Sequence, residues 1–185
     1  MSNSAPRTPV KLQDAHVLVV EDNVSIFVLI ARLLSFMGVN KCEWKTTGWG
    51  VVDFAKTMER VDLILMDLRL PHEDGYEALA QIRQDPALAE TLVIVVTAHG
   101  SNGEMKKAQA AGFDGFLSKP LDTDKFPQQI KDILQFTIIL LGPHMVSLNT
   151  VNQLGSNTDT VPHLPNASFK DVTNSEFSAD FPHIY

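Results

Sequence analysis

One short apolar segment near the middle of the chain constrains its fold most strongly. Residues 61–66 are apolar except for Asp62, and the segment ends at Asp67, shortly before Pro71 and Gly75. A run of this length bounded by proline and glycine is typical of a buried strand in a parallel sheet. Because burying an uncompensated carboxylate is costly, we expect Asp67 at the strand end, in the crevice where open α/β sheets bind ligands. On this segment alone, an aspartate that caps a helix or shapes a turn fits equally well.

Four further segments have the composition of strands, and all five alternate with segments of helical pattern. The predicted strands are residues 16–20, 41–46, 61–67, 92–96 and 113–118, and the predicted helices are residues 24–38, 48–60, 75–85, 101–112 and a fifth beginning near residue 123. This alternation predicts right-handed crossovers with helices on both faces of the sheet. The expected fold class is therefore α/β, with a doubly wound, five-stranded parallel sheet.

The first predicted helix carries two apolar stripes, although packing on a sheet needs only one. The first stripe comprises Phe27, Ile30, Leu34 and Met37, and the second comprises Ile26, Leu29, Leu33 and Phe36. We expect the second stripe to be covered by a neighbouring helix, by the C-terminal tail or by a partner.

Length and charge narrow the functional classes. With 185 residues and 44% hydrophobic content, the chain can form one domain, expected at residues 14–136, with a flexible leader at 1–13 and an irregular extension at 137–185. The net charge of -7 argues against a nucleic-acid partner. The single cysteine, Cys42, excludes an intrachain disulfide, and no signal peptide or membrane-spanning run is visible. We expect a cytoplasmic protein with no membrane segment.

Polar residues stand at the predicted carboxyl ends of four strands. They are Glu21 and Asp22, Asp67, Thr97 and Lys119. Because the carboxyl ends of parallel strands share one edge, these side chains are expected to meet there. A carboxylate can accept a phosphoryl group as a nucleophile, and carboxylates are the hard oxygen ligands that Mg²⁺ prefers. An ammonium and a hydroxyl can bind the phosphoryl oxygens, so the edge is interpreted as a phosphoryl site.

The adjacent acids Glu21 and Asp22 have a second interpretation. Two neighbouring carboxylates repel each other, so a cation between them is a natural explanation. Alternatively, Asp22 or Asn23 caps the helix that follows. The two roles are compatible.

With these motifs, the chain resembles the response-regulator receiver domains of two-component signalling, of the single-domain chemotaxis and cell-cycle-regulator type. The resemblance covers residues 14–136 and rests on residues 20–23 (VEDN), 66–71 (MDLRLP) with Asp74 and Gly75, 96–98 (VTA) and 116–120 (FLSKP). It implies the flavodoxin-like (βα)5 receiver fold.

The resemblance also implies a role for each site residue. It implies Asp67 as phosphoacceptor, Mg²⁺ held by Glu21, Asp22, Asp67 and the backbone carbonyl of Arg69, Lys119 as the phosphoryl partner, and Thr97 and Phe116 as the switch pair. Phe116 stands where the family often has tyrosine, which keeps the packing but removes a hydroxyl.

The implied function is that of a phosphorylation-switched regulator. It would take its phosphoryl group from a histidine kinase or a histidine phosphotransfer protein, and it would catalyse only its own phosphorylation and dephosphorylation. Its output would be binding to a downstream protein target or onward phosphorelay. The remaining chain is short, is not basic and has no helix-turn-helix pattern, which favours a single-domain regulator that does not bind nucleic acid.

Two rival classes fit less well. A phosphohydrolase of the haloacid-dehalogenase type expects a second aspartate two residues after Asp67, where this chain has Arg69. A pseudo-receiver would have lost the acceptor, a metal-binding acid or Lys119, and none is lost. In the extension, aromatic residues alternate with acids over residues 169–181, which is either a docking segment or unstructured chain.

Overall fold

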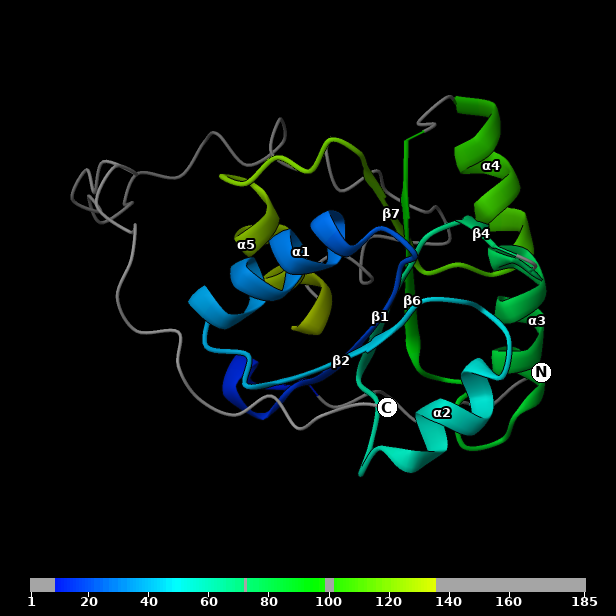
Figure 1. Cartoon of the computed structure of the whole chain (residues 1–185), viewed down its shortest axis with the longest axis horizontal. Helices are drawn as coiled ribbons and strands as arrows, with labels where there is room; N and C mark the ends of the chain where they lie inside the picture. Colours follow the sequence, from blue (N-terminus) through cyan, green and yellow to red (C-terminus); the bar gives the residue numbers. More distant parts are fainter. Residues whose placement is uncertain (1–8, 72, 99–101, 136–185) are drawn as a thin grey trace.

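Five parallel strands form the central sheet of the computed structural model, which describes residues 9–71, 73–98 and 102–135. The strands are β1 (His16–Val20), β2 (Lys41–Lys45), β3 (Leu63–Met66), β6 (Leu92–Thr97) and β7 (Gly115–Ser118), in the spatial order β2-β1-β3-β6-β7 (Figure 1). Every neighbouring pair is parallel. The predicted fold class, with five strands alternating with five α-helices, is confirmed.

The five α-helices cover both faces of this sheet. They are α1 (Val24–Phe36), α2 (Val51–Thr57), α3 (Gly75–Gln84), α4 (Asn102–Ala111) and α5 (Phe126–Leu134). The buried residues of α1 and α5 form one core cluster with the strands, and those of α2, α3 and α4 form the other (Figure 1). The sheet is therefore doubly wound, and sheets of this type bind ligands at the carboxyl ends of their strands.

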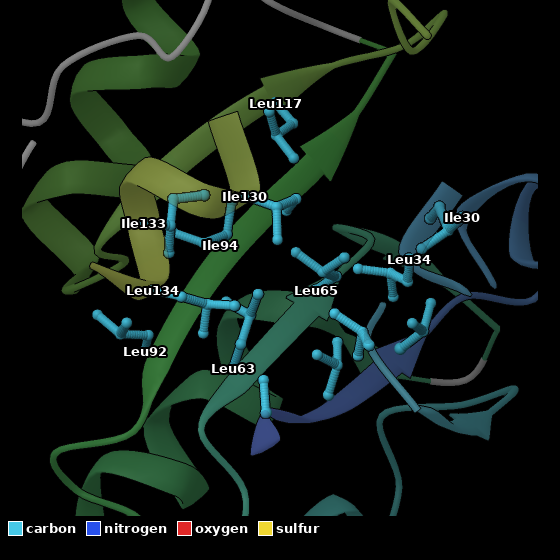
Figure 2. Packing of buried hydrophobic residues seen from close by; sticks show 14 of the residues in the cluster. Ile30, Leu34, Leu63, Leu65, Leu92, Ile94, Leu117, Ile130, Ile133 and Leu134 are labelled. Carbon is cyan, nitrogen blue, oxygen red and sulfur yellow. The ribbon is translucent and has the colours of Figure 1, made fainter. Parts of the chain in front are cut away.

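The packing of the central strand β3 explains why its sequence is continuously apolar. Leu63 and Leu65 pack with α1 and α5, as Figure 2 shows, whereas Ile64 and Met66 pack with the helices of the opposite face. All four side chains are buried. A strand covered on both faces has no position at which a polar side chain reaches water, so the first polar residue marks its end.

The second stripe of α1 is covered only in part. Ile26 and Leu33 pack against the core cluster that α5 completes, which agrees with the expected neighbouring helix. Phe36, at the end of the same stripe, is 88% exposed.

Three local features differ from the sequence-based predictions. The helix expected at 48–60 is the shorter α2, because Gly50 before it is left-handed, with φ of 63°, and Met58 after it is extended. A hairpin of β4 (Arg69–Leu70) and β5 (Glu73–Asp74), which was not predicted, precedes α3. Strands of two residues are too short to leave a hydrophobic pattern.

The third difference concerns the leader. A 3-10 turn spans Leu12–Asp14, and both Val10 and Leu12 pack against the core. The amide of Val10 also donates to the carbonyl of Leu134 at the end of α5, at 3.2 Å. Val10 and Leu12 therefore attach the end of the leader to the core, and the flexibility of the leader stays a prediction. Residues 1–8 and the extension at 137–185 lie outside the described residues. Among the residues that the structure describes, no helix has the length and apolar character to cross a bilayer.

Candidate functional site

The three acids singled out in the sequence meet at the carboxyl edge of the sheet. Val20 of β1 and Met66 of β3 are paired, so Glu21 and Asp67 follow neighbouring strands at the same level. The amide of Asp67 donates to the Val20 carbonyl at 2.9 Å, which continues the ladder by one residue. Glu21, Asp22 and Asp67 each offer a carboxylate oxygen, and these oxygens lie within 4.8 Å of one another. Glu21 and Asp67 are buried, whereas Asp22 is exposed.

Lys119 reaches this cluster from the carboxyl end of β7, the outermost strand on the side of the sheet away from β2. It follows β7, and its amide donates to the carbonyl of Thr97 at 2.8 Å. Its Nζ lies 2.5 Å from Oδ2 of Asp67 and 2.7 Å from Oε2 of Glu21. Strand β6 separates β7 from β3, so the long lysine stem is what allows the ammonium to reach both acids. The peptide bond between Lys119 and Pro120 is cis.

Burial and pairing set the protonation of this cluster. Burial raises the pKa of the Glu21 carboxyl, and this effect exceeds the opposing effect of the hydrogen bond from Lys119. Burial lowers the pKa of Lys119, but its hydrogen bonds to Asp67 and Glu21 outweigh burial, so the net pKa is raised. Lys119 therefore remains a cation at neutral pH and compensates the buried carboxylates.

The loop after β3 fixes the second oxygen of Asp67. Oδ1 accepts a hydrogen bond from the amide of Arg69 at 2.9 Å, while Lys119 binds Oδ2. Gly75 closes the loop, because its amide donates to the Leu68 carbonyl at 3.1 Å. A Cβ at position 75 would stand 2.7 Å from the backbone oxygen of Asp67, so this position needs glycine. Asp74 caps α3 by accepting from the amide of Tyr76 at 3.0 Å.

The two residues expected to form the switch lie close to this edge in the sheet. Thr97 is the last residue of β6 and is 1% exposed. Phe116 of β7 pairs with Val95 and is buried in the core cluster of the α2, α3 and α4 face. The backbone of Arg69 touches Asp67 through its amide, and the role of its carbonyl as a metal ligand stays a prediction.

The segment after β1 combines the two interpretations of its polar residues. Asn23 is the cap of α1, since its Oδ1 accepts from the amides of Ser25 and Ile26 at 3.0 and 3.2 Å. Asn23 therefore serves the helix, while Glu21 and Asp22 remain in the acidic cluster.

Sequence reasoning missed one residue at this site. The indole Nε1 of Trp44 donates to the backbone carbonyl of Glu21 at 2.8 Å. Trp44 lies on β2, a strand that was predicted only as a short segment, and nothing in the pattern indicates which neighbour its N–H will find.

Known proteins with similar sequences are response regulators and histidine kinases. The sequence model of the family described as response regulator receiver domain matches residues 17–131, which is more than half of the chain. The histidine-protein kinase BarA of Escherichia coli K12 is 39% identical over 109 residues, or 59% of this chain. The polar-differentiation response regulator DivK of Brucella anthropi is 32% identical over 118 residues, which cover 64% of this chain and 94% of that protein.

Several relatives are much longer than this chain. The match covers 12% of BarA and 4% of the hybrid histidine kinase G of Dictyostelium discoideum, which is 35% identical over 140 residues, or 75% of this chain. In these kinases the similarity is therefore to one segment of a large protein.

Solved structures show the same fold. The receiver domain of a sensor histidine kinase from Pseudomonas aeruginosa PAO1 is 31% identical with a TM-score of 0.57, and it covers 64% of this chain and 94% of that chain. That structure holds a magnesium ion in its active site cleft. The chemotaxis regulator CheY4 of Vibrio cholerae, at 24% identity, has a TM-score of 0.60 over 64% of this chain and 98% of that chain, which supports the fold alone. The chain belongs to the response regulator receiver domain family of two-component signalling.

Proposed function

We propose that this protein is a phosphorylation-switched response regulator that accepts a phosphoryl group on Asp67. The observation that carries the proposal is the contact of one ammonium, Lys119 Nζ, with both Asp67 and Glu21 inside a cluster of three carboxylates. A carboxylate paired with a mobile cation is suited to receive a group that carries spread negative charge.

The acidic cluster fits Mg²⁺. Three carboxylates and one ammonium leave two formal negative charges, which a divalent cation balances. Glu21, Asp22 and Asp67 would hold the ion, and the backbone carbonyl of Arg69 would add a further oxygen of the kind that Mg²⁺ prefers. When bound, the ion would neutralise charge on the phosphoryl oxygens. The magnesium in the similar receiver domain from P. aeruginosa supports this assignment.

The proposed transfer uses the chain's own groups in sequence. An oxygen of the Asp67 carboxylate attacks the phosphorus of a phosphohistidine, the new O–P bond forms as the P–N bond breaks, and the departing imidazole takes up a proton. Lys119 then exchanges its contact with Asp67 for one with a phosphoryl oxygen. The product is an acyl phosphate, and attack by water on phosphorus restores the carboxylate and releases phosphate.

The change of conformation on phosphorylation would follow from the charge of the phosphoryl group on Asp67. The hydroxyl of Thr97 would donate to a phosphoryl oxygen, and Phe116 would follow into the space that Thr97 leaves. A phosphoryl group changes the conformation only through contacts that differ between the two states, and these two residues would supply them.

The proposed partners follow from the phosphoryl chemistry. The donor would be a histidine kinase or a histidine phosphotransfer protein, and the similarity to segments of two histidine kinases supports this. The recipient of the signal would be a downstream protein or a further phosphotransfer protein. The net charge of -7 speaks against direct binding to nucleic acid. A cytoplasmic location, away from membranes, is part of the same proposal.

The test is phosphorylation by a small donor. The protein is incubated with acetyl phosphate, with and without Mg²⁺, and analysed by intact mass spectrometry. We expect a labile phosphoryl adduct that depends on Mg²⁺ in the wild type and in Asp53→Asn, a control at an exposed acid of α2, but not in Asp67→Asn. An equal adduct in Asp67→Asn, or none in the wild type, would contradict the proposal.

A further inference from the structure

The segment that carries two of the three acids is braced by an aromatic side chain from β2. Trp44 is half-buried, and its indole Nε1 donates to the backbone carbonyl of Glu21 at 2.8 Å. The amide of Glu21 donates in turn to the carbonyl of Lys45 at 3.0 Å. Strand β2 therefore holds both polar groups of the Glu21 backbone, one through its main chain and one through the Trp44 side chain.

The same indole also touches the helix that follows the acids. Its ring stacks on Phe27, with centroids 4.4 Å apart and planes 4° from parallel. Phe27 belongs to the first turn of α1, where its amide donates to the carbonyl of Asn23 at 3.0 Å. Trp44 thus contacts the residue before Asp22 and, one helical turn after Asn23, the ring of Phe27.

These contacts determine how the two acids are spaced. The carbonyl that Trp44 binds belongs to the peptide unit joining Glu21 to Asp22, so the hydrogen bond fixes the orientation of that unit. The Glu21 side chain is already held, because its two oxygens accept from the Asn23 amide at 3.2 Å and from Lys119 at 2.7 Å. Asp22 is exposed, and the peptide unit before it is the link that sets where its carboxylate stands.

We propose that Trp44 is a positioning residue, which fixes the Glu21–Asp22 peptide unit and so holds the Asp22 carboxylate in place for Mg²⁺. This inference rests on the proposed metal site and adds to it a residue that touches neither the ion nor the phosphoryl group. Groups that orient metal ligands through hydrogen bonds are part of a metal site, because a misplaced ligand binds more weakly.

The test compares two tryptophans that undergo the same substitution. Trp44→Phe removes the N–H but keeps a ring that can stack on Phe27, and Trp49→Phe changes a side chain that is 74% exposed. The dissociation constant for Mg²⁺ is measured by titration calorimetry without any phosphodonor. We expect Trp44→Phe to bind Mg²⁺ about threefold to tenfold more weakly, as for the loss of one hydrogen bond, and Trp49→Phe to bind like the wild type.

The outcomes separate this inference from the metal site itself. If Trp44→Phe binds Mg²⁺ as tightly as the wild type, Trp44 contributes only to packing and the inference is overturned. If the wild type does not bind Mg²⁺, the proposed metal site fails, and the role of Trp44 with it.

A second measurement leaves Trp44 in place, so it does not depend on the folding of the Trp44 variant. In Trp49→Phe, the remaining indole N–H gives one assignable NMR signal. We expect this signal to exchange slowly with solvent and to shift when Mg²⁺ is added. An indole signal that exchanges rapidly with solvent, or that does not shift when Mg²⁺ is added, would also overturn the inference.

Discussion

Replacing Gly75 with alanine is expected to disturb the loop that carries Asp67. The added Cβ would lie 2.7 Å from the Asp67 carbonyl oxygen and 3.0 Å from Cα of Leu68, whereas ordinary contacts begin at 3.4 Å. Both neighbouring atoms belong to the backbone, so the loop must move by several tenths of an ångström. Overpacking of this kind costs about 1–3 kcal/mol, and the better helix propensity of alanine offsets less than about 1 kcal/mol of it. We expect Gly75→Ala to lower the free energy of unfolding by about 1–2 kcal/mol.

A matched control separates lost stability from a displaced Asp67. Gly38 follows α1, its φ is 87°, and no atom lies within 4 Å of a Cβ built there. Gly38→Ala should cost about 1–2 kcal/mol through its left-handed backbone alone. Because α1 has 13 residues and begins next to the acids, Gly38 stands about 20 Å away along the helix axis.

The assay has two parts. Urea unfolding at equilibrium gives the free energy of unfolding of both variants, and intact mass gives their rate of phosphorylation by acetyl phosphate. We expect similar losses of stability, but slower phosphorylation only in Gly75→Ala. The reasoning is refuted if Gly75→Ala matches the wild type in both measurements, or if Gly38→Ala is phosphorylated as slowly.

Three further predictions concern the side chains of Arg83, Glu21 and Cys42. Arg83 donates to three backbone carbonyls and to Asp114, so Arg83→Leu should lose about 1–3 kcal/mol in urea unfolding while Mg²⁺ binding stays unchanged. Burial raises the pKa of Glu21 in the folded protein, so the free energy of unfolding falls as pH rises from 4.5 through that raised pKa. Glutamine cannot ionise, so without Mg²⁺ Glu21→Gln should unfold at a higher urea concentration than the wild type at pH 7 and at the same concentration below pH 4.5. Burial, with a smaller effect of the Glu43 charge, raises the pKa of the Cys42 thiol to about 12, so a disulfide reagent at pH 8 should react more than about a hundredfold slower in native protein than in urea.

The sheet and the meeting of the acids were predictable because both follow from the apolar runs of the strands. Strands buried on two faces leave an unbroken apolar run, and the first polar residue after each run marks the carboxyl edge. Glu21 and Asp67 stand at such positions, and Lys119 follows one residue after Ser118, the first polar residue of its strand. The structure brings these three side chains into contact. The helix cap was left between Asp22 and Asn23, because either side chain can accept the same amides, and the structure assigns it to Asn23.

What escaped the sequence depends on single contacts between distant segments. The N–H of Trp44 finds the Glu21 carbonyl only because β2 lies beside β1, and no periodic pattern encodes that bond. Similarly, the β4–β5 hairpin consists of two residue pairs, fewer than any hydrophobic period needs. The end of the leader was expected to be flexible because it is polar, yet Val10 and Leu12 are enough to attach it to the core.

The most direct measurement of the central claim is the position of the phosphoryl group. After phosphorylation with acetyl phosphate and Mg²⁺, sodium borohydride reduces an aspartyl phosphate to homoserine, which tandem mass spectrometry locates in the sequence. The account predicts homoserine at position 67, in an amount that rises with the degree of phosphorylation. Homoserine at another aspartate, or a phosphoryl group that resists borohydride on a serine, threonine or histidine, would contradict it.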